Sequence, residues 1–164
     1  MERGGTRTAP RRYSICPMDN FSVRRARSSD LDGFTALVRL FPAPAVPDEN
    51  WIRTCFLATI SDPKAYIAVA VDRDGAIAGY LSGYRHFAFY AGGETAWCDE
   101  VLVREDRRRR GVGKQLMRGF ELWATQNRCV LVSLATAGAK EFYRALGYAE
   151  KASYFKKYLS PEQA

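Results

Sequence analysis

The sequence predicts an α/β fold, in which a mixed central sheet of six to seven strands is flanked by about four helices. Short β-rich runs alternate with segments whose apolar residues recur every three or four positions, as in amphipathic helices. One Arg- and Gly-rich loop joins an apolar run to such a helix. The chain of 164 residues has the length of one domain and can bury a core without metal or disulfides.

The first twenty residues differ from the rest of the chain. Residues 1–20 mix Arg, Gly, Thr and Pro without apolar periodicity, so we expect a disordered leader before a single domain over residues 21–160. Met18 is an alternative start to Met1. The leader lacks the apolar stretch of a secretory signal, and no apolar run approaches the ~20 residues that cross a bilayer. We therefore expect a cytoplasmic protein without a membrane partner.

One strand and two helices are expected at the start of the domain. A short strand at Phe21 and Val23 precedes the capping cluster Ser28-Ser29-Asp30. Apolar residues at helical spacing follow as far as Phe41 and predict the first helix. A Pro-rich stretch over residues 42–47 ends it, and Asp48 caps the second helix.

A β-hairpin is expected in the middle of the chain. The β-rich runs 66–71 and 77–90 flank Asp72-Arg73-Asp74-Gly75, which is a tight-turn sequence. Gly92-Gly93 marks a second reversal. The hairpin aromatics Tyr84, Phe87, Phe89 and Tyr90 either pack across the hairpin or line an acceptor pocket.

The last part of the chain predicts alternating strands and helices. A strand over 96–103 leads through the Arg-rich loop to a helix over 111–127. The apolar run 129–134 is typical of a strand buried on both faces. A helix over 140–146 and a final strand over 148–159 complete the order β-α-α-β-β-β-α-β-α-β.

The cysteine and histidine content disfavours several kinds of site. The four cysteines lie far apart without a C-x-x-C pair, so we expect reduced thiols and no metal (Cys16, Cys55, Cys98, Cys129). His86 is the one histidine and lies in an expected strand, which leaves histidine-dependent hydrolysis poorly supported.

The net charge of +7 is concentrated in two segments. Residues 1–27 and 104–118 each carry a net charge of +5, so the remainder carries −3. A mildly acidic body with two basic segments fits one localised polyanionic ligand better than a continuous nucleic-acid-binding face. A nucleic-acid-binding module stays as an alternative.

The loop Arg108 to Lys114 has the features of a pyrophosphate site. It lies where a strand meets a helix, and a helix start presents unpaired N–H groups. Gly111 and Gly113 let oxygen atoms approach the main chain. The Rossmann pattern fails because Leu116 stands where a third glycine is needed, and the Walker pattern fails at Arg108 and Gln115. Without its glycines the arginine run would be only a solvated charged segment.

Two motifs carry a resemblance to a known family. Arg108-x-x-Gly111-x-Gly113 after a strand, followed by Ala139 to Tyr148 with the pattern A-x-x-F-Y-x-x-x-G-Y, resembles the GNAT family of N-acetyltransferases. The resemblance implies a splayed sheet, whose fourth and fifth strands part to admit the pantetheine arm of acetyl-CoA. It implies transfer of an acetyl group to a primary amine by direct attack in a ternary complex, with acetyl-CoA as co-substrate.

The resemblance also implies roles for individual residues. Main-chain groups of Val101, Leu102 and Val103 would bind the pantetheine arm. The pyrophosphate would be held by the loop residues Arg108, Arg109, Arg110, Gly111, Val112, Gly113 and Lys114. Tyr143 would donate a proton to the departing thiolate, although helix-surface packing would also account for a tyrosine there.

Two positions depart from the family pattern. Thr136 stands where many relatives have Asn, and its hydroxyl can still bond to the arm. Trp97 stands where some relatives have a Glu base, which leaves Asp99 and Glu100 nearby. Since neighbouring strand residues face opposite sides, we expect at most one of these carboxylates to reach the site, and we favour Glu100 acting through water.

The acceptor stays open. A small-molecule or peptide amine fits the family, and five carboxylates favour a cationic amine (Asp48, Glu49, Glu94, Asp99, Glu100). A family member that binds acyl-CoA as a sensor without catalysis is a further alternative, and a homodimer is left open.

Overall fold

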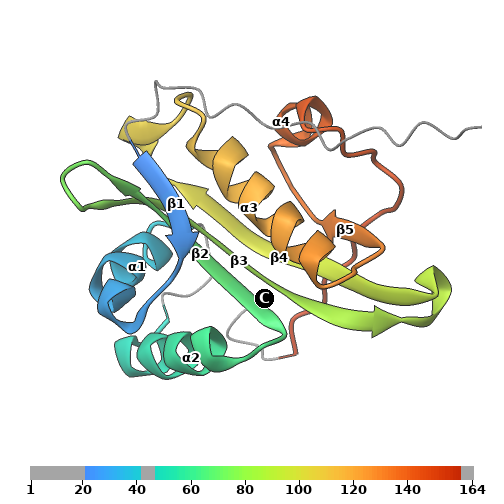
Figure 1. The fold of residues 1–164 in the computed structure, drawn as a ribbon, viewed down its shortest axis with the longest axis horizontal. Coiled ribbons are helices and arrows are strands. Elements are labelled where there is room, and N and C mark those ends of the chain that lie inside the picture. Colours follow the sequence, from blue (N-terminus) through green and yellow to red (C-terminus); the bar gives the residue numbers. More distant parts are fainter. Residues whose placement is uncertain (1–20, 42–46, 160–164) are drawn as a thin grey trace, which may run out of the picture.

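The computed structural model describes residues 21–41 and 47–159, and these form a mixed α/β fold (Figure 1). Five strands form one sheet: β1 (Phe21–Arg25), β2 (Ala65–Asp72), β3 (Ile77–Ala88), β4 (Gly93–Val103) and β5 (Leu131–Leu134). Four α-helices accompany them: α1 (Leu31–Val38), α2 (Glu49–Ser61), α3 (Val112–Gln126) and α4 (Lys140–Ala145). The strands lie in sequence order, antiparallel from β1 to β4, and β5 runs parallel to β4.

The number of strands differs from the prediction. The described sheet has five strands, because the strand expected over 148–159 does not form. Its residues have no regular structure, and Phe155 and Leu159 are about nine-tenths exposed. Aromatic β-formers make a strand only where an edge can pair with them, and β5 offers an edge of four residues. The expected leader over 1–20 and most of the Pro-rich stretch lie outside the described residues.

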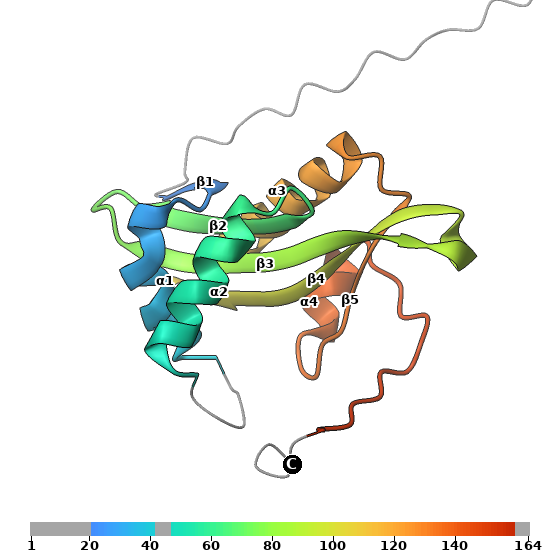
Figure 2. The same cartoon turned by 90° about the horizontal axis from the view of Figure 1, so that it is seen from below.

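Helix α3 covers one face of the sheet and α1 and α2 cover the other (Figure 2), so the sheet separates two apolar cores. On one face α3 packs through Val112, Leu116, Met117 and Phe120 against strand residues such as Leu81, Ala96 and Cys98. On the other face α1 and α2 pack through Phe34, Leu37, Ile52 and Phe56 against Val69, Tyr80 and Leu102. Each strand residue therefore faces either α3 or the α1–α2 layer.

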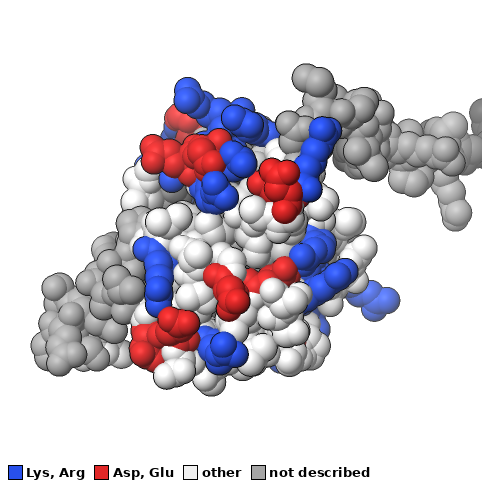
Figure 3. All heavy atoms as spheres, turned by 90° about the vertical axis from the view of Figure 1, so that its left-hand side faces the viewer, with Lys and Arg blue, Asp and Glu red and all other residues white. Residues whose placement is uncertain are grey.

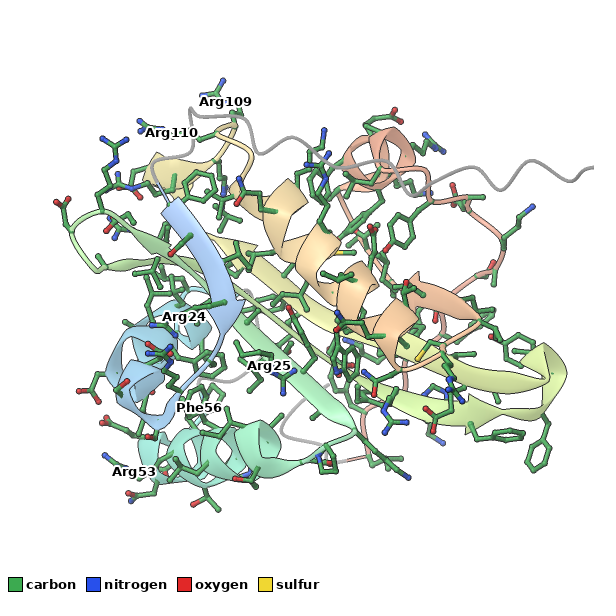
Figure 4. All side chains as sticks on the ribbon, in the orientation of Figure 1. Arg24, Arg25, Arg53, Phe56, Arg109 and Arg110 are labelled. Atoms are coloured by element: carbon green, nitrogen blue, oxygen red, sulfur yellow. The ribbon has the colours of Figure 1, made fainter. Side chains whose placement is uncertain are left out.

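The first two helices begin as side chains near their N-termini dictate. Asp48 accepts from the N–H groups of Asn50 and Trp51, which confirms it as the cap of α2. Asp30, by contrast, is buried and accepts both ends of the Arg24 guanidinium at 2.6 and 2.8 Å. Figure 4 shows Arg24 reaching from β1 toward α1. The bonds from Arg24 hold the pKa of Asp30 below its usual range, so this pair ties β1 to α1.

The central hairpin forms as predicted. The strand expected over 129–134 also forms, but the prediction that both its faces are buried is wrong. Gly75 with φ 83° and Gly92 with φ 67° occupy the two reversals, where a left-handed backbone favours glycine. The run at 129–134 gives the strand β5, but its residues are only half-buried because β5 is an edge of the described sheet. No helix among the described residues is long and apolar enough to span a membrane.

Candidate functional site

Strands β4 and β5 part in the middle of β4. Their parallel pairing runs from Thr95 with Leu131 to Cys98 with Leu134 and then ends. β4 continues to Val103 and stays paired with β3 on its other side. In Figure 1, β4 runs on toward the Arg-rich loop after β5 has ended. Residues 99–103 thus border an opening in the sheet, as a splayed sheet requires.

The register shows which main-chain groups face this opening. The Arg104 N–H donates to the Ala78 carbonyl at 2.9 Å, across the β3–β4 ladder. Successive residues of a strand point their main-chain N–H and C=O groups to opposite sides. The main-chain groups of Leu102 therefore face β3, whereas those of Val101 and Val103 face the opening. The Arg108 Nε donates to the Val103 carbonyl at 3.1 Å, which agrees with this assignment.

The loop before α3 has the backbone of an anion site. Arg109 and Gly111 both have a left-handed conformation, with φ 60° and 85°. The first helical bond runs from the Gln115 N–H to the Gly111 carbonyl at 3.0 Å. The N–H groups of Val112, Gly113 and Lys114 therefore have no place in the helical ladder and are directed at the loop. Glycine at 111 is required by its φ, since a residue with a Cβ rarely adopts that conformation.

The two loop glycines have different environments. A Cβ on Gly111 would meet nothing within 4 Å, which leaves the space above it open to a ligand. A Cβ on Gly113 would lie 3.3 Å from the Phe142 ring and 3.7 Å from Val103. We expected glycine at 113 to leave room for a phosphate oxygen. In the structure the missing Cβ instead leaves room for the Phe142 ring, so Gly113 allows α3 to approach α4.

The basic side chains of the loop are only partly available. Arg107 forms ion pairs with Asp72 and Asp106, and Arg104 pairs with Asp106 as well. Arg109 and Arg110 are exposed, have no ion pair among the described residues, and point away from the body in Figure 4. Figure 3 shows blue and red side chains intermixed at the top of the adjoining face. This mixture argues against a continuous nucleic-acid-binding surface there.

Tyr143 of α4 lies beside the opening, on the α3 face of the sheet. Its ring is half-buried, 5.0 Å from that of Phe142 and 5.9 Å from that of Tyr148 between centroids. Burial raises the pKa of Tyr143 to about 12, and the nearby Cys98 thiol adds to the shift. Cys98 is the last β4 residue paired with β5, so the phenol is close to where the strands part. At neutral pH Tyr143 is therefore protonated and able to donate a proton.

Thr136 lies in the turn between β5 and α4. Its hydroxyl oxygen accepts from the Ala139 N–H at 3.1 Å, so it holds the start of α4. The hydroxyl hydrogen is still available to one acceptor, which is fewer contacts than an Asn side chain could supply.

A β-bulge at Asp99 places Asp99 and Glu100 on the same face of the sheet, whereas regular alternation along the strand predicts opposite faces. Ser82 pairs with Glu100 and Gly83 with Cys98, so Asp99 is an extra residue in β4. Burial, followed by the Asp99 charge, raises the pKa of Tyr84, and Glu100 accepts from Tyr80 and Ser82. Tyr80, Ser82 and Tyr84 alternate along the α1–α2 face of β3. Both carboxylates therefore lie on that face.

The two carboxylates have different surroundings. Glu100 accepts from the Tyr80 hydroxyl at 2.8 Å and from the Ser82 hydroxyl at 3.4 Å, both on Oε2. No described residue donates to its Oε1. Asp99 is an exposed residue, but partial burial of its carboxyl group, followed by the Glu100 charge, raises the pKa of Asp99 to about 6. The side chain of Trp97 opposes that shift by hydrogen bonding to Asp99.

Several supporting residues were not identified from the sequence. Tyr80 and Ser82 hold Glu100, and their alternation along β3 could have indicated a shared face. Tyr154 stacks on Trp97 at 6.4 Å between ring centroids. No pattern predicted that contact, because it joins the irregular segment after α4 to β4.

Two surface hollows lie away from this opening. One of about 450 Å³ lies between α3 and β1, bordered by Arg25 and Trp123, and one of about 580 Å³ lies between α1 and the β2–β3 turn. Neither is bordered by Tyr143, Asp99 or Glu100. Within the described ranges no group of three or more His, Cys, Asp or Glu residues is arranged to hold a metal. The site is thus identified by strand register and backbone conformation.

Comparisons with known proteins give the family and the fold. The sequence model of the Acetyltransferase (GNAT) family matches residues 31–148. No curated protein matches the chain.

Solved acetyltransferase structures are similar to the whole domain. Glucosamine-6-phosphate N-acetyltransferase from Arabidopsis thaliana has TM-score 0.76 and 23% identity, over 87% of this chain and 100% of that one. An aminoglycoside N-acetyltransferase in complex with CoA has TM-score 0.75 and 18% identity, over 89% and 100%. An aminoglycoside acetyltransferase from an uncultured soil metagenomic sample, in complex with sisomicin, has TM-score 0.70 and 21% identity, over 86% and 97%. At these identities the likeness shows the fold alone.

Proposed function

This chain belongs to the GNAT acetyltransferase family, and on that basis we propose that it transfers an acetyl group from acetyl-CoA to a primary amine by direct attack in a ternary complex. One observation carries the proposal. β4 and β5 part at residue 99, with Tyr143 beside the opening on one face of the sheet and Glu100 on the other. A thioester at that point would have a proton donor on one side and a base on the other.

The donor half of the site would bind acetyl-CoA mainly through the main chain. The N–H groups of Val112, Gly113 and Lys114 offer the pyrophosphate a helix start, and the left-handed residues Arg109 and Gly111 shape the loop around it. Val101 and Val103 offer polar groups to the pantetheine arm, and Thr136 offers a hydroxyl. Leu102, whose polar groups face β3, would contribute by keeping that edge in place.

Arg108 would connect the two parts of the donor half. Its Nε already bonds to the Val103 carbonyl, which lies on the edge that the arm would use. A bound arm would compete for this carbonyl and release the guanidinium toward the phosphates. Arg109, Arg110 and Lys114 would add charge around them without fixing their position.

The transfer requires several proton movements. An amine binds as an ammonium and must lose one proton before its lone pair can attack, and Glu100 would accept that proton through water at Oε1. As the nitrogen bonds to the thioester carbon, the C–S bond breaks and the sulfur takes the Tyr143 proton. The new amide nitrogen releases its second proton to water, the Tyr143 phenolate regains one from solvent, and Glu100 returns its proton to water. Acetyl-CoA presents the acetyl group as a thioester, and the carbonyl carbon of a thioester is readily attacked by an amine.

Release of free thiol tests the proposal. Purified protein with acetyl-CoA and a panel of small primary amines is expected to release CoA thiol in proportion to acetylated amine. Binding of acetyl-CoA without thiol release from any amine would favour a sensor. A protein that ignores acetyl-CoA and binds nucleic acid with a steep salt dependence would contradict both.

A further inference from the structure

The β3–β4 surface beside the opening combines acidic and aromatic side chains. We name it the acceptor wall and define it by Tyr84, Trp97, Asp99, Glu100 and Tyr154. Tyr84 and Trp97 are a cross-strand pair, and the Tyr154 ring stacks on Trp97 with an angle of 25° between the planes. The wall draws on β3, β4 and the segment after α4.

The two acids of the wall have no cationic partner of their own. No ion pair of Asp99 or Glu100 with Lys or Arg occurs in residues 21–41 and 47–159, although both sit where the sheet opens. Elsewhere in the described chain acids such as Asp30, Asp72 and Asp106 are each paired with arginine. Burial raises the pKa of Asp99, and the repulsion from the neighbouring Glu100 carboxylate adds to this rise.

The aromatic rings add a second, independent preference for a cation. Tyr84 is 41% and Tyr154 62% exposed, so their rings are accessible from solvent. An organic cation against an aromatic face gains about 0.5–2 kcal/mol, more when it is partly desolvated. An anion in the same place would meet two carboxylates and the negative faces of the rings.

The chemistry of the transfer separates the two carboxylates. The reacting nitrogen must be neutral when it attacks, so its own charge cannot hold the substrate in the reactive complex. Glu100, held by Tyr80 and Ser82, takes up the proton from that nitrogen. Asp99, one residue away and beside Trp97, is left to bind a charge elsewhere on the substrate.

We infer that the acceptor is a small diamine or polyamine, with one amino group that reacts near Glu100 and a second that remains an ammonium between Asp99 and the rings of the acceptor wall. The inference rests on the proposed acetyltransferase function and adds the class of substrate. His86 on β3 adjoins the wall, with its ring 5.4 Å from that of Tyr84 between centroids. Substrates with a carboxylate at the remote end are rejected by Asp99.

A matched set of three amines tests this inference. 1,4-Diaminobutane, pentan-1-amine and 5-aminopentanoate carry the same reacting group on chains of similar length, with a cationic, neutral or anionic remote end. With thiol release as the assay, we expect kcat/KM to fall in that order, by roughly tenfold between the first two, which is about 1.4 kcal/mol for one charged hydrogen bond. Equal values for the first two, or the highest value for the aminopentanoate, would overturn the inference while leaving the acetyltransferase function in place.

Variants make the test specific to the wall. Asp99→Asn is expected to raise KM for diaminobutane about tenfold more than KM for pentan-1-amine, since only the diamine uses the carboxylate. Asp74→Asn, an exposed acid in the β2–β3 turn at the other end of β3, is the matched control and should change neither. An equal effect of Asp99→Asn on both amines would contradict the assignment. Absence of thiol release with every amine would count against the proposed function itself.

Discussion

The two halves of the proposed site are built from different parts of the chain. The donor half is almost contiguous, since the open edge of β4 and the loop before α3 lie within residues 101–114, and in the proposal it acts mostly through main-chain groups. The acceptor wall gathers side chains from β3, β4 and the segment after α4. Contiguous backbone geometry leaves a motif in the sequence, whereas side chains assembled by register do not. The sequence therefore indicated the family, but it did not identify the acceptor substrate.

The largest expected effect is on Tyr143, which adjoins both halves. Tyr143→Phe keeps the ring beside Phe142 and removes the proton donor, so kcat is expected to fall roughly 100- to 10,000-fold with little change in acetyl-CoA binding. The loss should shrink with an acyl donor whose thiol is more acidic. Because the pKa of Tyr143 is about 12, the parent enzyme should show no alkaline loss from this residue below about pH 11.

A tyrosine that only packs would behave differently. Tyr143→Phe would then lower the melting temperature. Turnover would be unchanged, or it would fall by the same factor for every leaving thiol. Steady-state kinetics with two thioester donors, alongside thermal melting, separates these outcomes. Unchanged turnover would remove Tyr143 from the mechanism.

The loop before α3 gives the next largest effect. Acetyl-CoA at a hundred times its Kd should stabilise the parent protein by about 2.7 kcal/mol. Gly111→Ala is expected to abolish most of that gain, because a Cβ disfavours φ 85° and the N–H groups would turn away from the phosphates. Gly75→Ala is the matched control, with φ 83° and the same open surroundings. If acetyl-CoA stabilises both variants alike, the loop does not bind it.

A pH dependence should distinguish the acceptor half from the donor half. Asp99 has a raised pKa of about 6, so it is charged above that pH and becomes neutral as the pH falls through it. KM for a diamine is therefore expected to rise roughly tenfold between about pH 7 and 5, whereas Kd for acetyl-CoA should change little. Asp99→Asn should remove this rise in KM at low pH. If the rise in KM persists in the variant, Asp99 does not carry the pH dependence.

The smallest effect concerns the exposed arginines. If the main chain holds the pyrophosphate, Arg109→Gln or Arg110→Gln should weaken acetyl-CoA binding only about three- to tenfold, and the loss should diminish in high salt. Isothermal titration at two salt concentrations measures this. A loss as large as that of Gly111→Ala would show that side-chain charge, rather than backbone geometry, dominates the donor half.

The sequence predicted the local elements well and the long-range ones poorly. The cap Asp48, the hairpin turns at Gly75 and Gly92, and the helix after Gly111 follow from nearby residues, and each is confirmed. The strand over 148–159 is wrong because a strand depends on an available partner edge. The bulge at Asp99 could not be predicted because one extra residue in β4 shows only in its pairing with β3. That single residue places both carboxylates on one face.

Separability of the two halves is tested most directly by measuring both Michaelis constants in three proteins: the parent, Gly111→Ala and Asp99→Asn. Thiol release is followed while acetyl-CoA and 1,4-diaminobutane are varied in turn. Gly111→Ala is predicted to raise KM for acetyl-CoA with little change in KM for the diamine. Asp99→Asn is predicted to raise KM for the diamine with little change in KM for acetyl-CoA. If both variants raise the same constant, or each raises both equally, the division into a main-chain donor half and a side-chain acceptor wall is wrong.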